Sequence, residues 1–350
     1  MEYYGCNAID GLNLGVVGRF DLPVEEQKNL SLCCEPRKSR PGISLGKTPE
    51  ETLERFLGMR HRLIVRGGAS IPKDGDPCVP CPYYIKRDRG FSLQISSITF
   101  GMTPAPCQCH CFYCTQNQGI AEGWEKNPNV IEAYRRLFDF LNLARKENII
   151  TNNTSWTLAS GEITVHPYKK QFMQVLKGGR VNFYTNCFIF DEDIARELHE
   201  NPFAAMNLSM DSGTANTWRK VKGVDNFPQV IENLKQYSRA AHHPEQISLK
   251  YIIFPGINDS DEDFHAFVDF KKTWRMSLGT FSRDNRFFKN LNASNGDPGV
   301  NQVFDPKLIE SAARLSAIHA KEIGPVSFSN FTEEEQRQVI NRAQQILQSA

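Results

Sequence analysis

Four cysteines lie within eight residues of this chain, from Cys107 to Cys114, and no other feature limits its fold and chemistry as strongly. The chain of 350 residues has ten cysteines in all, and its first residues lack the basic start and apolar run of a secretory signal. We therefore expect a cytoplasmic protein, in which clustered cysteines serve metal or redox chemistry rather than structural disulfides.

The cysteine-rich stretch reads Cys107-Gln-Cys-His-Cys-Phe-Tyr-Cys114. The spacing Cys107-x3-Cys111-x2-Cys114 places three thiolates on one tight loop. Three thiolates on a four-iron cluster leave one iron open, and a small molecule can chelate that iron through an amine and a carboxylate. Zinc is the alternative, because Cys109 or His110 would supply the fourth ligand of a closed zinc site.

This loop resembles the signature of the radical S-adenosylmethionine (radical SAM) superfamily. There the cysteines are spaced three and then two residues apart, and an aromatic residue precedes the third. The resemblance implies a [4Fe-4S] cluster on Cys107, Cys111 and Cys114, S-adenosyl-L-methionine as cofactor, and Tyr113 at the cofactor. Cys109 falls outside the pattern and is expected to be incidental.

A later segment, Ser160-Gly-Glu-Ile-Thr-Val-His-Pro167, is similar to the Gly-Gly-Glu-Pro segment of the same superfamily. Here Ser160 replaces the first glycine and Ile163 replaces the proline. The resemblance implies that Gly161 lets the backbone approach the cofactor, and that Glu162 accepts a hydrogen bond from the methionine amine. An ordinary strand-to-helix turn is the alternative.

The segment Asn207-Leu-Ser-Met-Asp-Ser-Gly213 resembles the fourth strand of the superfamily, which often reads Ser-x-Asp-Ser. The resemblance implies that Ser209 or Asp211 meets the cofactor's ribose or carboxylate, or the substrate. Polar residues at the end of a strand are the alternative. The pair Thr185-Asn186 also fits the family's usual Thr-Asn after the third strand.

The segment Lys250-Tyr-Ile-Ile-Phe-Pro-Gly-Ile-Asn-Asp259 resembles the fifth strand and its Asn-Asp turn. The resemblance implies that Lys250 pairs with the cofactor carboxylate; a surface lysine is the alternative. Asn258 is expected to cap the following helix. Arg283 and Arg286, after the predicted sixth strand, are either anion-binding residues at the mouth of the site or part of a solvated loop.

Strands alternate with helices from residue 91 onward, which is typical of parallel βαβ units. We expect an α/β fold: a partial (β/α)6 TIM-like barrel over 89–290, with a cysteine-rich unit over 1–88 and a helical extension over 291–350. Such barrels carry their active sites at the C-terminal ends of the strands. A hairpin is expected over Gly11–Phe20. The expected strands are Ser92–Phe100, Ser155–Leu158, Arg180–Thr185, Ala204–Met210, Ile247–Phe254 and Ser277–Ser282, and the expected helices are Glu51–Met59, Asn127–Ala144, Lys169–Leu176, Asp191–His199, Phe227–Tyr237, Glu262–Lys272, Pro306–Ile323 and Thr332–Leu347.

The N-terminal unit holds five further cysteines. Cys78 and Cys81 form a Cys-x2-Cys pair, a common two-ligand element of zinc and iron–sulfur sites. Cys33, Cys34 and Cys6 are the candidates for the remaining ligands. The unit resembles the auxiliary-cluster modules of the SPASM and twitch types, which implies a second iron–sulfur cluster. A structural zinc knuckle is the alternative.

The resemblance implies an enzyme that cleaves S-adenosylmethionine reductively, with an electron from a flavodoxin- or ferredoxin-type donor, and then abstracts hydrogen from a substrate. Peptide or protein substrates are expected, because auxiliary modules often accompany such enzymes; a carbohydrate or small metabolite is the alternative. Cys187, after the third strand, is a candidate hydrogen donor or coupling thiol, or else a buried apolar cysteine.

Composition argues against other classes of partner. Lys and Arg number 41 against 40 for Asp and Glu, so no overall positive charge favours nucleic acid. No apolar run reaches the roughly 18 residues of a membrane-spanning helix, and no membrane partner is expected. A non-catalytic iron–sulfur or zinc scaffold is the alternative from another functional class.

Overall fold

A computed structural model describes residues 3–17, 20–32, 42–69, 85–87, 92–102, 105–114, 123–276, 279–284 and 305–349. The chain forms two compact units. The first contains Met1–Pro106 and Gln116–Phe183, and the second contains Cys107–Thr115 and Tyr184–Ala350. The expected boundaries near residues 88 and 290 stay a prediction.

Parallel strands form the centre of the first unit. Strand β7 (Ser155–Leu158) pairs in parallel with β6 (Ser97–Met102) on one side and with β8 (Arg180–Thr185) on the other. The other edge of β6 pairs in parallel with β2 (Leu14–Val17), which continues into the antiparallel strands β3 (Leu30–Ser31) and β4 (Gly42–Ile43). A separate ribbon joins β1 (Tyr3–Gly5) to β5 (Ile85–Arg87).

The expected hairpin over Gly11–Phe20 is wrong. Only Leu14–Val17 forms a strand among the described residues of this stretch, and it pairs with β6 and β3 rather than with its own neighbours. The physical reason is burial. Leu14 and Val16 are almost fully buried, and packing their apolar side chains in the core of the larger sheet stabilises this pairing.

Helices of the first unit begin where the sequence provides caps. The side chain of Asn127 accepts a hydrogen bond from the Asn129 N–H at the start of α3 (Pro128–Lys146). Thr48 bonds the Glu51 N–H at the start of α2 (Pro49–Ala69), which is longer than the helix expected. The remaining helical segments are α1 (Asn7–Asp10), η1 (Val24–Glu26), η2 (Trp124–Lys126), η3 (Ile163–Val165) and α4 (Lys169–Leu176).

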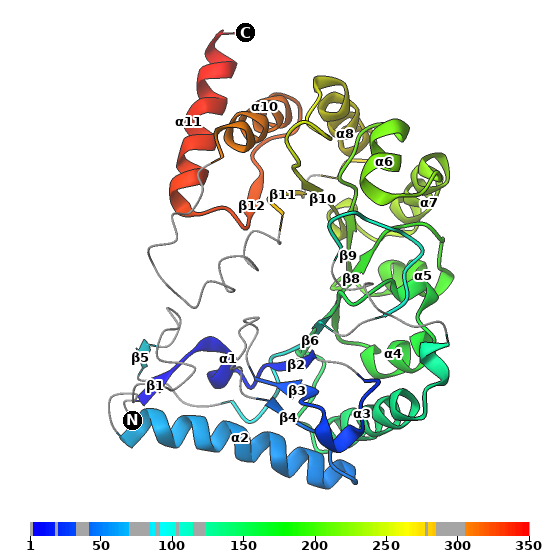
Figure 1. Cartoon of the computed structure of the whole chain (residues 1–350), viewed down its shortest axis with the longest axis vertical. Coiled ribbons are helices and arrows are strands. Elements are labelled where there is room, and N and C mark those ends of the chain that lie inside the picture. Colours follow the sequence, from blue (N-terminus) through cyan, green and yellow to red (C-terminus); the bar gives the residue numbers. More distant parts are fainter. Residues whose placement is uncertain are drawn as a thin grey trace. The chain divides into compact units, whose positions relative to one another are not determined.

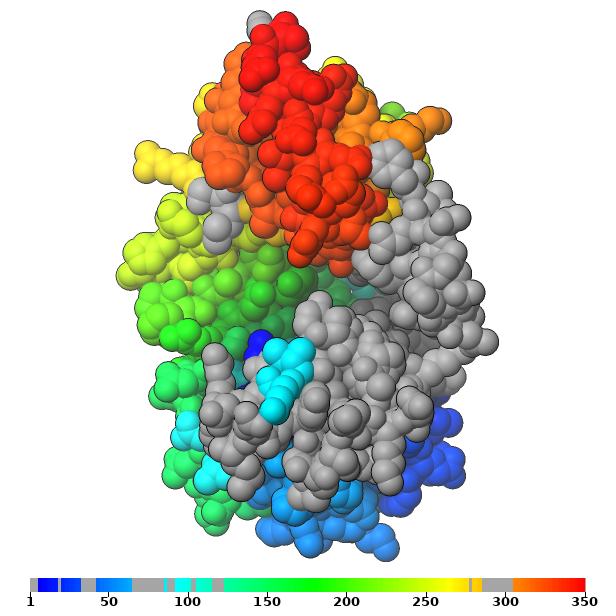
Figure 2. Space-filling view, turned by 90° about the vertical axis from the view of Figure 1, so that its left-hand side faces the viewer, coloured from blue at the N-terminus to red at the C-terminus, as the bar shows by residue number. Residues whose placement is uncertain are grey.

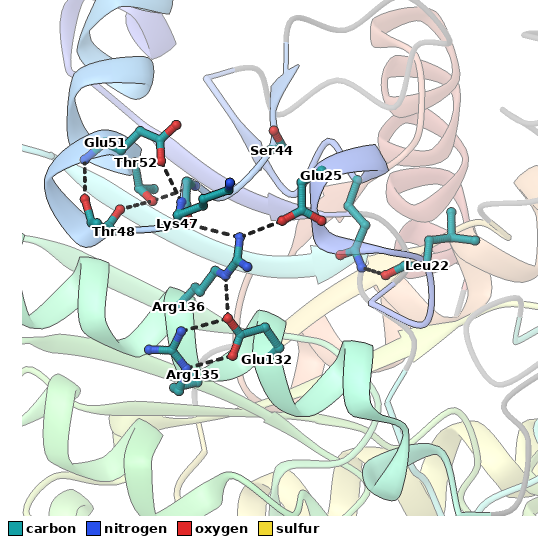
Figure 3. Close-up of polar contacts among 12 residues, drawn as sticks. Leu22, Glu25, Ser44, Lys47, Thr48, Glu51, Thr52, Glu132, Arg135 and Arg136 are labelled. Atoms are coloured by element: carbon teal, nitrogen blue, oxygen red, sulfur yellow. Dashed lines mark hydrogen bonds and ion pairs between the residues drawn. The ribbon is translucent and has the colours of Figure 1, made fainter.

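Arg136 ties α3 to the segment that precedes α2, as Figure 3 shows. Its guanidinium donates to Glu132 at 2.7 Å, to Glu25 at 3.1 Å and to the carbonyl oxygen of Gly46 at 3.3 Å. One largely buried arginine therefore joins three separate parts of the first unit.

In the described part of the second unit, four parallel strands alternate with helices (Figure 1). Strand β10 (Ile247–Ile252) pairs with β9 (Ala205–Ser209) and β11 (Gly279–Ser282), and β11 pairs with β12 (Ser327–Ser329). The mixed α/β fold with mostly parallel strands in β/α order confirms the predicted partial TIM-like fold class. The helical segments are α5 (Glu192–Glu200), α6 (Ala215–Lys222), α7 (Phe227–Ala240), η4 (Pro244–Gln246), α8 (Asp261–Thr273), α10 (Pro306–Glu322) and α11 (Glu333–Ser349).

The C-terminal helices α10 and α11 lie against each other, orange and red in Figure 2. Val339 and Ala343 on α11 are buried, and Arg342 forms a bidentate contact with Glu310 of α10 at 2.8 and 3.2 Å. Within the part of the chain that the structure describes, no helix is long and apolar enough to cross a membrane.

Candidate cluster and cofactor site

The cysteine loop, Cys107–Cys114, belongs to the second unit. A turn closes its end, where the Cys114 N–H donates to the Cys111 carbonyl at 3.0 Å. Cys107, Cys111 and Cys114 are half-buried, while Cys109 is only 2% exposed. None of the four forms a disulfide, so all four sulfurs keep their thiol chemistry.

Cys109 lies between two of the predicted ligands. Hydrogen bonds to Cys107 and Cys111, together with burial, raise the pKa of the Cys109 thiol far above its usual range. The same hydrogen bond from Cys109 lowers the pKa of Cys111 to about 7; burial opposes this shift, and the charge of Lys222 supports it. The two opposite pKa shifts make Cys109 the donor and Cys111 the acceptor of this hydrogen bond.

Asn186 directly follows β8. Its side-chain amide donates to the Cys107 sulfur at 3.3 Å and to the side-chain oxygen of Gln108 at 3.2 Å. Its own side-chain oxygen accepts from the Phe188 N–H at 2.8 Å, which fixes the orientation of the amide. An N–H donor at a cysteine sulfur is the kind of contact that adjusts the potential of iron–sulfur clusters.

Tyr113, Asp211 and Lys222 form a buried polar group beside the loop. The Tyr113 hydroxyl donates to Asp211 at 2.6 Å and accepts from the Lys222 ammonium at 2.9 Å, and Lys222 pairs with the same carboxylate. Burial and the charge of Asp211 raise the pKa of Tyr113 well above its usual value, and Cys111 adds to this shift. Tyr113 therefore stays protonated, and its hydroxyl is committed to protein partners.

Asp211 and Asn258 join the ends of β9 and β10. The second carboxylate oxygen of Asp211 accepts from the Ile252 N–H at 2.7 Å. Asn258, fully buried, donates to the carbonyl oxygens of Asp211 and Ile252 at 2.9 and 2.8 Å and accepts from the Phe254 N–H. The expectation that Asn258 caps the next helix is wrong, because these bonds use its amide and Ser260 caps α8 instead.

Ser209 and Lys250 are direct neighbours across β9 and β10. Both are half-buried. Burial lowers the pKa of Lys250, with the nearby charge of Asp211 acting in the opposite direction. No hydrogen bond or ion pair joins the Lys250 ammonium to another described residue, so it is an available cation at this end of the sheet.

Gly161 and Glu162 lie in the first unit, after β7. Gly161 has a positive φ of 57°, and a Cβ atom there would lie 2.5 Å from the Ala105 carbonyl oxygen, so only glycine fits. Glu162 is buried, and one of its carboxylate oxygens accepts from the backbone N–H and the hydroxyl of Thr164. The short helix η3 follows Glu162 directly, and the assignment of Gly161 and Glu162 to the cofactor stays a prediction.

The remaining predicted residues belong to several different elements. Cys187 is fully buried, with a positive φ of 60° and its N–H bonded to the Thr185 hydroxyl. Arg283 forms a buried ion pair with Glu335 of α11 at 2.6 Å. Cys6 precedes α1 as its N-cap residue. The other predicted residues, Cys33, Cys34, Cys78, Cys81 and Arg286, lie outside the described residues.

The chemistry of the loop fits an iron–sulfur cluster. Three thiols lie on one short segment, one of them with a pKa of about 7, and an amide N–H and a buried ammonium group stand beside them. Thiolate ligands supported by hydrogen-bond donors and positive charge are what such clusters require. Over the described ranges, no three His, Cys, Asp or Glu side chains already converge as a metal site.

Comparison with known proteins finds a family that this region resembles. Residues 106–269 match the family model described as Radical SAM superfamily. A curated relative, named a probable GTP 3',8-cyclase, from Saccharolobus solfataricus, is 26% identical over 151 residues, which cover 41% of this chain and 44% of the relative. The chain therefore spans less than half of the length of that curated relative.

Two solved structures are similar at low identity. SuiB from Streptococcus suis, bound to the precursor peptide SuiA, is 13% identical with a TM-score of 0.47 and covers 83% of this chain and 56% of that one. A radical SAM methyltransferase from Sphaerobacter thermophilus is 13% identical with a TM-score of 0.43 and covers 66% of each chain. The match of residues 106–269, which contain the cysteine loop, identifies a region of this chain that is similar to the radical SAM domain.

Proposed function

We propose that this protein cleaves S-adenosylmethionine reductively and abstracts a hydrogen atom from a substrate, with a [4Fe-4S] cluster on Cys107, Cys111 and Cys114. The observation that carries the proposal is the cysteine loop inside the matched domain, with Asn186 bonded to the Cys107 sulfur. When bound, the cluster supplies the electron that converts S-adenosylmethionine to methionine and a 5'-deoxyadenosyl radical.

The protein's own residues bind and orient the cofactor. Lys250 offers an available ammonium group for the methionine carboxylate, and Ser209 is its neighbour across the sheet. Gly161 and Glu162 are proposed to bind the methionine amine, because their segment resembles the one that does so in the radical SAM superfamily. Asp211 contributes differently, because protein donors occupy both of its carboxylate oxygens: it orients Tyr113 through the tyrosine hydroxyl.

The substrate is proposed to be a peptide or protein, on the basis of the cysteine-rich N-terminal segment and the modules that it resembles. A nucleotide or other small metabolite is the second candidate, and the similarity to a probable GTP 3',8-cyclase favours it. Cys187 is the candidate hydrogen donor to a substrate radical. Its burial keeps its thiol away from solvent, which such a donor requires.

A second iron–sulfur cluster is proposed for the N-terminal segment, with ligands among Cys6, Cys33, Cys34, Cys78 and Cys81. A zinc knuckle on the same cysteines is the alternative. The electron donor is proposed to be a flavodoxin or ferredoxin of the cytoplasm, since the chemistry needs one low-potential electron per cleavage.

The first experiment is anaerobic reconstitution, followed by iron and sulfide analysis and addition of dithionite and S-adenosylmethionine. Formation of 5'-deoxyadenosine supports the proposal, and about four irons for each cluster are expected. Bound zinc without 5'-deoxyadenosine would overturn it in favour of a non-catalytic scaffold. Deuterium transfer into 5'-deoxyadenosine from a labelled peptide, or from labelled GTP, then decides between the two substrate classes.

A further inference from the structure

The last turn of helix α6 holds the cysteine loop through its main chain. The His110 N–H donates to the Lys222 carbonyl at 2.8 Å, and the Phe112 N–H donates to the Val221 carbonyl at 3.4 Å. Gly223 ends the helix with a φ of 69°, and a Cβ atom there would lie 2.8 Å from the His110 carbonyl oxygen. This close approach needs glycine, so the loop and the helix end are fitted to each other.

The side chain of Lys222 makes a second connection to the same loop. It is 2% exposed, although lysine is seldom buried without a partner. Its ammonium group bonds Asp211 and the Tyr113 hydroxyl, and it lies 5.4 Å from the centre of the Tyr113 ring and 5.6 Å from that of Trp218. The lysine is therefore fixed from several sides rather than free to turn toward solvent.

The positive charge of Lys222 reaches the predicted cluster ligands. Burial acts to lower the pKa of Lys222, but Asp211 and Cys111 outweigh it and hold that pKa above the usual value, so the group is charged. Its ammonium group bonds the Tyr113 hydroxyl at 2.9 Å, and Tyr113 directly precedes Cys114 in the loop. Carbonyl groups at the end of a helix disfavour nearby negative charge, and the ammonium group of Lys222 offsets this effect at the loop.

We propose that Lys222 is a positioning residue of the cluster. Its carbonyl group accepts from His110 and fixes the loop, its ammonium group holds the Tyr113 hydroxyl both directly and through Asp211, and the same charge beside the loop makes the bound cluster easier to reduce. This inference rests on the proposed function, because it requires a cluster on the cysteine loop. In this proposal, a residue of helix α6 helps to set the reduction potential of the cluster.

The test is the midpoint potential of the reconstituted cluster without S-adenosylmethionine, measured by titration with detection of the reduced cluster by EPR. The charge-removing variant is Lys222→Met, and Lys222→Arg keeps the charge. Lys220→Met is the matched control, because Lys220 is exposed on the same helix. We expect a more negative midpoint potential for Lys222→Met, a value near wild type for Lys222→Arg and no change for Lys220→Met.

The Lys222→Met variant leaves Asp211 buried and unpaired, which destabilises folded proteins strongly. The double variant Lys222→Met/Asp211→Asn removes both charges, and its potential is also expected to be more negative, because the ammonium group of Lys222 lies against both the hydroxyl and the ring of Tyr113 in the loop. Loss of the cluster from Lys222→Met and from the double variant, with normal iron in Lys222→Arg, likewise supports the role of the charge.

Wild-type potential in Lys222→Met or in the double variant, with iron intact, overturns the inference and leaves Lys222 a purely structural residue. Such a result does not affect the proposed function. Wild-type protein that binds no iron on reconstitution overturns the proposed function itself, so the two failures are distinguished by the iron content of the wild type.

Discussion

Asn186 donates its side-chain amide to the sulfur of Cys107 at 3.3 Å, from the residue that directly follows strand β8. The amide cannot turn away, because its oxygen accepts from the Phe188 N–H. A loop cysteine and a residue 79 positions later in the chain are thus held in fixed contact. If Cys107 is a cluster ligand, Asn186 influences the cluster without binding it.

The substitution Asn186→Asp tests this contact. It keeps the acceptor for Phe188 but replaces the N–H at the sulfur by a negative oxygen. Hydrogen bonds to cluster sulfurs and positive surroundings favour the reduced state, so the midpoint potential should become more negative, as measured by EPR-monitored titration. The same substitution at the exposed Asn152 is the control and should change nothing. An unchanged potential in Asn186→Asp would remove this residue from the list of groups that tune the cluster.

Replacement of single cysteines in the loop distinguishes the three predicted cluster ligands from Cys109. Cys107→Ala, Cys111→Ala and Cys114→Ala should each abolish formation of 5'-deoxyadenosine, because three thiolates are needed to hold the cluster. Cys109→Ala should keep the iron of this cluster, since Cys109 falls outside the three-then-two spacing of the predicted ligands. Iron analysis and assay of 5'-deoxyadenosine check both expectations. Loss of about four irons in Cys109→Ala would instead make Cys109 a ligand.

The upstream cysteines have their own test. The double variant Cys78→Ala/Cys81→Ala should halve the iron content of the reconstituted protein while the cluster on the loop remains. The reason is that an auxiliary cluster loses two of its thiolates, whereas the loop keeps all three. Retained 5'-deoxyadenosine formation is the internal control for the loop. Unchanged iron with loss of zinc would establish the zinc knuckle.

The sequence was sufficient to predict the elements with strong periodic or capping signals. The helix that begins after Asn127 and the strands at 155–158, 180–185 and 247–252 follow from apolar periodicity and caps. The cysteine loop was identified from its spacing, together with its resemblance to the radical SAM signature. These features depend on residues close together in the chain, so they can be predicted without knowledge of the folded structure.

Helix α6 and Lys222 could not be predicted in this way. The segment Ala215–Lys222 has only eight residues, and three of them are exposed polar or charged residues, so its apolar periodicity is weak. The available signals were the cap at Thr214 and Gly223 after the end of the helix. A lysine in the last turn of a helix is normally solvated. Its burial depends on Asp211, a partner whose position only the folded chain determines. Asn258 was mistaken for a cap for the same reason.

Gly213 provides a prediction on the stability of the second unit. A Cβ atom at this position would lie 2.0 Å from the Asp263 carbonyl oxygen, a backbone atom that cannot move aside. The Gly213 N–H also bonds the Asp263 carboxylate. Gly213→Ala should therefore lower the free energy of unfolding by about 3 kcal/mol, measured by urea denaturation.

Gly58, inside helix α2, is the matched control for Gly213. A Cβ atom there would meet only the end of the Arg62 side chain at 3.6 Å. Gly58→Ala should raise the free energy of unfolding by about 0.5–1 kcal/mol, because alanine favours the helix. Equal effects of the two substitutions would contradict the close contact at Gly213.

Two buried histidines predict how stability depends on pH. Burial lowers the pKa of His166 to about 4, and burial with the charge of Lys271 lowers that of His319 to about 4. Both histidines stay neutral in the folded protein, whereas the unfolded chain binds protons below pH ~6.5. Their contribution to the free energy of unfolding is therefore complete above pH ~6.5, and it is lost as the pH falls toward 4. From pH 7 to pH 5 each should cost about 2 kcal/mol of unfolding free energy.

The variant His166→Phe checks this expectation. Phenylalanine suits the ring cluster around this position, in which Tyr134 and Phe172 contact the histidine. It removes the acceptor for the Tyr168 N–H, so stability at pH 7 should fall, but the further loss between pH 7 and pH 5 should become smaller than in wild type by about 2 kcal/mol. Replacement of the exposed His61 is the control and should leave the pH dependence as it is. Urea denaturation at each pH measures the difference, and a His166→Phe curve parallel to that of wild type would mean that His166 is protonated equally in the folded and unfolded chains.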